Sequence, residues 1–363
     1  MPTFASGIVQ KIKKLKEFEY WPFGVFYIPL YFYGFYLAFK SKSFMYFSTT
    51  NPGMKYGGVM GESKISVLDR IDAKYLPKTI FINKGAEFKE IRSLMNEKGF
   101  GFPLIVKPNI GERGKGVEKI ESKQALENYF GEHQEDIIIQ EFIDYPVELG
   151  VLYYRHPNET TGHISSVVMK EFLEIEGDGH TTLLELIDAK PRATGRREYL
   201  LNKYASQLND VLPKGEKIRL EPIGNHCRGT KFLNGNHLIN SQLESVFDQF
   251  ARDIKGYNYG RFDLKVKSLE DLYLGKNIKI LELNGVSSEP AHVYDPDMKL
   301  INAYKDVFKH ASIIQQIGYA NHKNGAPYSP LYTFVKELIS FLNAPKKEII
   351  KEDTAQYEME NLA

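Results

Sequence analysis

Two neighbouring segments of the chain, GRFDLKV at 260–266 and IKILELNG at 278–285, decide the fold and locate the candidate site. Successive side chains of a β-strand point to opposite faces, so polar and apolar residues separate when they alternate. The polar residues that share one face of each segment are Arg261, Asp263, Glu282 and Asn284. The apolar residues expected on the opposite face are Phe262, Leu264, Leu281 and Leu283.

The short connection between these segments lets the two strands pair antiparallel. Pairing would gather one arginine, two carboxylates and one amide on a single patch. Carboxylate and amide oxygens suit Mg²⁺, which usually keeps water and substrate phosphates in its other positions. A solvated polar face is the simpler alternative, but it would accept Lys, Ser or Thr as readily as this set.

A glycine-rich loop follows an apolar strand in FPLIVKPNIGERGKGVEKI, residues 102–120. The strand ends at Lys107, and Gly111, Gly114 and Gly116 follow it. Glycines let backbone N–H groups approach phosphate oxygens closely, and the basic residues add charge. A plain hairpin with solvated basic residues remains the alternative.

A third segment, DIIIQEFIDYPVELGVLYY at 136–154, places carboxylates at the ends of two apolar strands. The first strand delivers Glu141 and Ile143, and Glu148 opens the second. A strand that leads into a short connection can offer backbone groups to an adenine edge and a carboxylate to ribose hydroxyls. Two core strands with exposed glutamates are the alternative.

The composition is that of a soluble mixed α/β protein. The 363 residues include 47 Lys and Arg against 46 Asp and Glu, and a net charge of +1 argues against a general nucleic-acid binder. One cysteine, Cys227, excludes an internal disulfide framework. We also expect a strand at 44–47 and a capping box formed by Ser241 and Glu244.

The N-terminal region is dominated by aromatic residues. Tyr20 to Phe39 carries no charge, and eleven of its twenty residues are aromatic. The run could span a bilayer, lie in its interface or pack against the protein, and its two prolines and two glycines argue against one straight helix. Basic residues flank it, so we expect peripheral membrane contact through 11–42, at the inner face of the cytoplasmic membrane.

Common motifs are missing, among them GxxxxGK[ST], GxGxxG, HExxH and GxSxG. The three segments instead resemble the ATP-grasp superfamily in their order: Lys before a glycine-rich loop, an acidic strand end, then Asp and Glu-x-Asn on two strands. The resemblance covers about 63–295 and is nearest to carboxylate–amine ligases. GDGHTTLLELI at 177–187 is similar to an element of cyanophycin synthetase and bifunctional glutathione synthetase.

The resemblance implies an α/β fold in which two lobes with antiparallel sheets hold ATP between them, preceded by the aromatic region. The implied domains are residues 1–60, an ATP-grasp domain at 61–345 and a polar tail at 346–363. The smaller lobe would cover about 75–145 and the catalytic lobe 146–345.

The resemblance also implies site roles. Arg261 would stabilise the oxyanion of the tetrahedral intermediate, and Asp263, Glu282 and Asn284 would hold two Mg²⁺ ions, with Mn²⁺ as an alternative. The ATP site would comprise Lys64, Lys107, Gly114, Gly116, Glu141, Ile143, Glu148 and Lys170.

The implied activity is a cytoplasmic ATP-dependent ligase that joins a small-molecule carboxylate to an amine through an acyl phosphate, releasing ADP and phosphate. A kinase that stops at phosphoryl transfer and a nucleotide-binding module without catalysis are the alternatives. The sequence names neither substrate and leaves the oligomeric state open.

Overall fold

The computed structural model describes residues 17–111 and 114–343, so the expected tail at 346–363 and the lysines before residue 17 lie outside it. The chain divides into two compact units. Among the described residues, the first unit contains 17–169 and 233–341, and the second contains 170–232 with 342–343.

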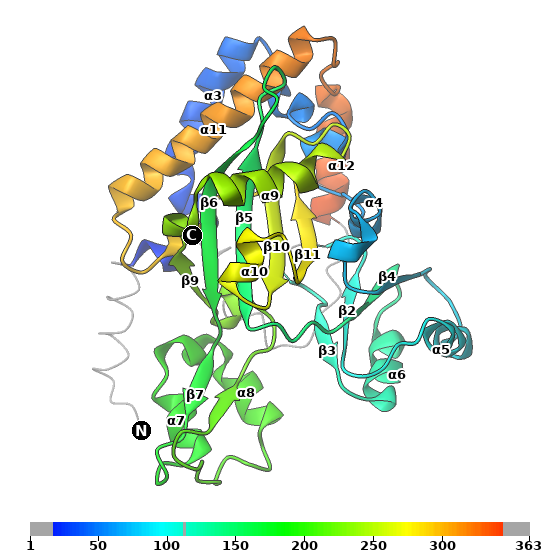
Figure 1. The fold of residues 1–363 in the computed structure, drawn as a ribbon, viewed down its shortest axis with the longest axis vertical. Coiled ribbons are helices and arrows are strands. Elements are labelled where there is room, and N and C mark those ends of the chain that lie inside the picture. Colours follow the sequence, from blue (N-terminus) through cyan, green and yellow to red (C-terminus); the bar gives the residue numbers. More distant parts are fainter. Residues whose placement is uncertain (1–16, 112–113, 344–363) are drawn as a thin grey trace. The chain divides into compact units, whose positions relative to one another are not determined.

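A five-stranded sheet forms the centre of the first unit, with strand order β11-β10-β5-β6-β9. Its strands are β5 (Val147–Tyr154), β6 (His163–Glu171), β9 (Lys231–Asn234), β10 (Tyr259–Val266) and β11 (Ile278–Asn284). Helices α9 (Ser241–Arg252) and α10 (Leu269–Tyr273) lie over one face of this sheet (Figure 1). Phe247 of α9 and Phe262 of β10 meet there in a core that excludes water.

A four-stranded antiparallel sheet, in the order β1-β4-β2-β3, belongs to the same unit. Its strands and the helices packed on it are β1 (Thr79–Ile82), β2 (Leu104–Pro108), β3 (Glu118–Ile120), β4 (Ile137–Glu141), α5 (Phe88–Glu97) and α6 (Lys123–Glu132). Ile91 and Leu126 from the two helices join the buried strand residues in one apolar cluster. The near-continuous apolar runs of β2 and β4 therefore mark central strands.

The aromatic N-terminal run forms two helices, α2 (Phe23–Phe26) and α3 (Ile28–Ser41). Pro22 precedes the first helix and Pro29 lies in the first turn of the second, where proline is tolerated. The expectation that these residues prevent one straight helix is confirmed. No helix in the described part of the chain is long and apolar enough to cross a membrane.

The strand expected at 44–47 is wrong, because a 3-10 helix, Tyr46–Thr49, occupies this position. Its polar side chains bond to helix α11 (Leu300–Lys323) and to their own turn. Thr49 Oγ1 donates to Gly318 O at 2.7 Å, and Ser48 Oγ donates to Met45 O at 2.7 Å. Such local side-chain bonds compete with a strand ladder.

The remaining helices of the first unit are α4 (Lys64–Leu68), α11 (Leu300–Lys323) and α12 (Leu331–Asn343), the last of which crosses the boundary between the units. Helix α3 runs beside α11 (Figure 1), and Gln315 of α11 donates to Ser41 of α3 at 2.8 Å. The buried Asn51 fixes the following loop, since its side chain bonds to Gly57 O at 2.9 Å and to Tyr259 O at 2.8 Å.

The second unit has its own small core and a two-stranded sheet of β7 (Glu174–Glu176) and β8 (Lys217–Arg219), with helices α7 (Leu183–Asp188) and α8 (Arg197–Lys203). A capping box formed by Thr182 and Glu185 begins α7. The capping box expected for α9 is wrong, because Asn240 is the N-cap there and accepts from Leu243 N at 2.9 Å.

Candidate active site

The polar faces of β10 and β11 meet at one edge of the larger sheet, where β11 is the outermost strand. In the register of the two strands, Asp263 is opposite Glu282 and Arg261 is opposite Asn284. Arg261 Nε donates to Asp263 Oδ2 at 3.0 Å, and its Nη2 forms an ion pair with the same oxygen at 3.0 Å. Asn284 Nδ2 also donates to this oxygen, at 3.2 Å. The structure therefore brings all four side chains to one patch.

The patch is strongly charged and mostly screened from water. Asp263 is only 5% exposed. Burial lowers the pKa of Arg261, but the carboxylates of Asp263, Glu282 and Glu289 outweigh burial and hold that pKa above its usual value. The guanidinium thus stays charged beside three carboxylates.

Glu289 is a member of this charged group that the sequence reasoning missed. It follows the Asn284 turn, and Tyr294 donates to its Oε2 at 2.8 Å. Burial, together with the Glu289 charge, raises the pKa of Tyr27, whose hydroxyl lies 3.3 Å from that of Tyr294. Only its position five residues past Asn284 could have pointed to it.

The expectation that Leu281 points into the core is wrong. The β10–β11 register shifts between Asp263 and Leu264, so Leu281 is the extra residue of a β-bulge. Ile280 and Leu283 belong to the core cluster, whereas Leu281 does not. Its carbonyl oxygen instead accepts from Lys107 Nζ at 3.1 Å.

Lys107 reaches the patch from the smaller sheet. It is 6% exposed, and its Nζ also lies 3.2 Å from Gln140 Oε1. Burial lowers the pKa of Lys107 to about 8, with Glu282 opposing the shift and Lys64 adding to it. A bound anion would stabilise the charged form of this ammonium.

A second buried ion pair lies one step along β10. Lys265 Nζ is 3.8 Å from Glu148 Oε2 and donates to Ile143 O at 2.9 Å. Glu148 and Lys265 are 5% and 4% exposed, so Glu148 is not a solvated glutamate. Glu141 ends β4 and is half-buried. Sequence reasoning missed Lys265, although it shares a strand face with Asp263.

The glycine-rich loop keeps the backbone form that glycine favours. Gly114 and Gly116 have φ of 72° and 65°. A Cβ on Gly116 would lie 2.8 Å from Pro108 Cγ, so the loop folds back tightly on β2. Residues 112 and 113 of this loop lie outside the described residues.

Lys64 stands at the start of α4 and donates from Nζ to Gly111 O at 2.6 Å. Asn109 also bonds to the first turn of α4, since its Oδ1 accepts from Ile65 N at 3.1 Å. Lys170 is the next-to-last residue of β6 and the first residue of the second unit, and it is half-buried.

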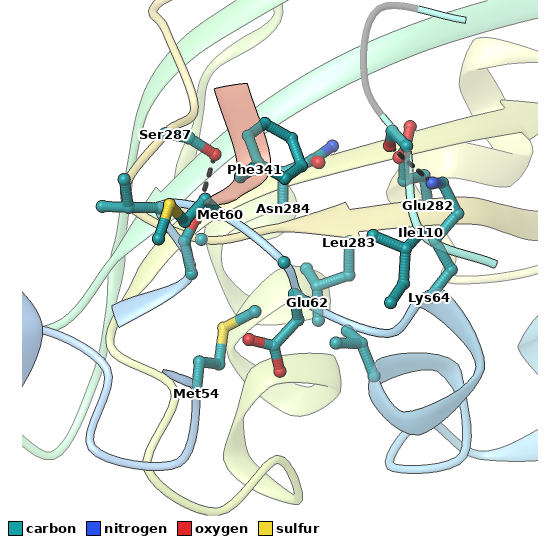
Figure 2. Close-up of a pocket in the computed structure, with 16 residues that line it drawn as sticks. Met54, Met60, Glu62, Lys64, Ile110, Glu282, Leu283, Asn284, Ser287 and Phe341 are labelled. Atoms are coloured by element: carbon teal, nitrogen blue, oxygen red, sulfur yellow. Dashed lines mark hydrogen bonds between the residues drawn. The ribbon is translucent and has the colours of Figure 1, made fainter. Parts of the chain in front are cut away.

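A pocket opens beside the patch, with about 510 Å³ of empty space that is partly open to solvent. Figure 2 shows Glu282, Asn284 and Lys64 on its wall. The loop that precedes α4 forms another wall and is tied to the turn after β11, because Ser287 Oγ donates to Gly58 O at 3.0 Å. The apolar residues that line the pocket are Met54, Val59, Met60, Val67, Ile110, Leu283 and Phe341.

Gly150 has no side chain to crowd Arg261 and Asp263. It is another residue that sequence reasoning missed. It pairs with Asp263 across β5 and β10. A Cβ there would lie 3.1 Å from Arg261 Cδ and 3.2 Å from Asp263 Oδ1. A glycine inside a strand was the available signal, because it often marks a close approach.

The donor set fits Mg²⁺ that arrives with a phosphate ligand. Two carboxylates and one amide lie together, and the described residues contain no group of three or more His, Cys, Asp or Glu side chains that could hold a metal. Mg²⁺ is commonly bound through one or two carboxylates plus substrate phosphates.

Comparison with known proteins adds a family match. Residues 67–150 match the model of the RimK-like ATP-grasp domain. The chain is 31% identical over 122 residues to a formate-dependent phosphoribosylglycinamide formyltransferase of Methanocella arvoryzae, covering 32% of this chain and 29% of that protein. A Prochlorococcus marinus protein of the same description is 32% identical over 106 residues, covering 27% and 26%. The chain thus spans under a third of the length of these curated relatives.

Similar solved structures include D-alanine–D-alanine ligase from Bacillus anthracis, with 15% identity, a TM-score of 0.41 and coverage of 74% of this chain and 71% of that one. The VanG D-Ala:D-Ser ligase from Enterococcus faecalis has 16% identity, a TM-score of 0.36 and coverage of 68% and 57%.

Residues 67–150 thus match an ATP-grasp domain, which confirms the resemblance to the ATP-grasp superfamily in this segment. The antiparallel sheets and the helices packed on them confirm the mixed α/β fold class. Proteins of this superfamily use ATP together with divalent metal ions.

Proposed function

We propose that the protein is an ATP-dependent ligase that joins a carboxylate to an amine. A carboxylate oxygen attacks the γ-phosphorus of ATP, and ADP leaves with the electron pair of the broken bond. The amine nitrogen then attacks the acyl carbon, the C–N bond forms, and phosphate departs while the nitrogen loses a proton. The observation that carries the proposal is the cluster of Arg261, Asp263 and Asn284, with Glu282 directly opposite Asp263.

Arg261 is the residue placed to stabilise charge on the carbonyl oxygen. Its guanidinium is fixed from one side by Asp263. The backbone N–H of Arg261 donates to the Ser288 hydroxyl at 3.1 Å, and this bond ties Arg261 to the turn after β11. A donor held in place before the reaction needs no reorganisation as charge develops.

Asp263, Glu282 and Asn284 would hold two Mg²⁺ ions, which neutralise the transferring phosphoryl group when bound. Lys107 would neutralise phosphate oxygens, and the backbone of Gly114 and Gly116 would approach them. This chain's own contribution is to hold the metal-binding side chains on β10 and β11 and to bring Lys107 to them from the smaller sheet.

On the nucleotide side, Glu148 would accept from ribose hydroxyls, and Glu141 with the backbone of Ile143 would face the adenine. Lys265 supports this arrangement because it bonds to both Ile143 O and Glu148. Lys64 supplies a further proposed phosphate contact.

The pocket of Figure 2 suits the acid substrate. Its wall combines apolar residues with polar ones, namely Glu62, Lys64, Glu282, Asn284 and Ser287. We therefore assign it to a small carboxylic acid that carries polar as well as apolar groups. The reaction would run in the cytoplasm, where ATP is supplied.

The product nucleotide tests the proposal. The protein is incubated with ATP, Mg²⁺ and a panel of aliphatic and aromatic acids, each with and without an amine, and the products are separated by chromatography. We expect ADP and phosphate that depend on both acid and amine, and no product with Asp263→Asn. AMP with pyrophosphate would refute the acyl-phosphate route, and phosphorylated acid that ignores every amine would indicate a kinase.

A further inference from the structure

Helix α3 has large apolar residues on the side that faces away from the protein as well as on its buried side. Its most exposed apolar residues recur at the spacing of one helical face and are 48–84% exposed: Ile28, Tyr31, Phe32, Phe35, Tyr36 and Phe39. The opposite side carries Leu37, Ala38 and Ser41, which are buried. A surface helix of a globular protein normally carries polar and charged residues on its exposed face.

The exposed face continues beyond α3. Phe23 and Val25 of α2 are more than 40% exposed. Phe44, which follows α3, is 59% exposed and lies edge-on to Phe35 with ring centroids 6.1 Å apart. We call the exposed residues of 23–44 the aromatic face. Contiguous apolar surface of this kind marks a binding site for another protein or a membrane.

The charges around the aromatic face are of one sign. No Asp or Glu occurs from Tyr20 to Gly61. Lys40 and Lys42 are exposed at the C-terminal end of α3, and four more lysines precede the run in the sequence, at 11, 13, 14 and 16. Residues 1–61 contain seven lysines and two glutamates, although the whole chain has a net charge of only +1.

We propose that the aromatic face docks on an anionic lipid surface, with α3 lying in the plane of the membrane. The 14 residues of α3 make a helix of about 21 Å, shorter than the roughly 30 Å hydrocarbon core, so the helix fits the interface. Tyrosines and phenylalanines enter the headgroup boundary, while lysines keep their ammonium groups among anionic headgroups. A self-association surface would gain nothing from this excess of lysines.

Vesicle sedimentation of the full chain tests the proposal. Phosphatidylcholine vesicles with about one-third phosphatidylglycerol are compared with pure phosphatidylcholine in low salt. We expect binding to the anionic vesicles and weakening by added salt, because screening shortens the reach of the lysine charges.

The decisive variant is Phe32→Asp/Phe39→Asp, which changes two side chains that are 72% and 84% exposed. Its vesicle affinity should fall by about 100-fold or more. The matched control, Val211→Asp/Leu274→Asp, adds the same charge at exposed apolar residues elsewhere and should bind vesicles like the wild type. Circular dichroism checks that both variants are folded.

Three results would overturn the proposal. The wild type could ignore anionic vesicles, or the Phe32→Asp/Phe39→Asp variant could bind them as well as the wild type does. Light scattering could also show a dimer that this variant dissociates, without vesicle binding, which would make the aromatic face a contact between two copies.

Discussion

The buried ammonium of Lys107 makes a quantitative prediction about stability and pH. Its pKa is about 8 in the folded protein, against 10.5 for an ordinary lysine, because burial disfavours the charged form. Between these two values the unfolded chain binds one more proton than the folded chain. Stability therefore rises with pH there, and the cost of the buried charge is fully present below pH 8.

The magnitude follows from the two pKa values. Integrating the difference in bound protons from pH 7 to pH 9 gives a gain of about 1.4 kcal/mol for the wild type. Lys107→Met lacks this group and keeps every other titrating residue. The difference between the two proteins thus isolates Lys107, whatever the substitution does to the bonds with Gln140 and Leu281.

The assay is urea unfolding of both proteins at pH 7, 8 and 9, read as the free energy of unfolding. The wild type should gain about 1.4 kcal/mol relative to Lys107→Met across this range. Parallel curves for the two proteins would show that Lys107 titrates as in water, and the burial argument would fail. Calorimetry gives a second readout, because ATP affinity of the wild type should fall as pH rises through 8.

Three further predictions concern Arg261, Gly150 and His310. Arg261→Ala should lower kcat by about 10²–10³ with the fold intact, which steady-state kinetics and circular dichroism would check. Gly150→Ala should lower kcat by about tenfold, because its Cβ crowds Arg261 and Asp263, whereas Gly131→Ala, with nothing within 4 Å, should not. Burial first, and His292 next, lower the pKa of His310 to about 3, so the folded protein binds fewer protons than the unfolded chain below pH 6.5. Between pH 7 and 5 the wild type should lose about 2 kcal/mol more stability than His310→Asn, measured by urea unfolding.

Strand alternation was enough to predict the shared face of Arg261 and Asp263 and its meeting with Glu282 and Asn284. The pattern works because one face of each strand is buried under α9 and α10, so a register error would expose the core. The apolar runs around Lys107 and before Glu141 likewise predicted the two central strands of the smaller sheet.

The bulge at Leu281 lay beyond this reasoning. A bulge inserts one residue into one strand, and the alternation of Ile280, Leu281 and Leu283 does not show which of them is the extra one. In the structure the extra residue is Leu281, which has no partner in the β10–β11 register. Its carbonyl oxygen accepts a hydrogen bond from Lys107 of the smaller sheet. The turn at 46–49 was missed for a related reason, since its partners in α11 are some 270 residues away.

The N-terminal segment also has a buried side that packs on the protein, and this contact determines how the role of the segment can be tested. Phe26 and Tyr27 are buried against Val293 and Val307, so deleting the segment would uncover an apolar cluster. It would also remove the Tyr27 hydroxyl, which lies beside that of Tyr294. Tyr294 donates to Glu289, and the charge of Glu289 raises the pKa of Arg261. A truncated chain could therefore lose activity without any involvement of lipid. Substitutions confined to the exposed face leave this inner contact in place, so they alone separate membrane docking from the support that the segment gives to the site.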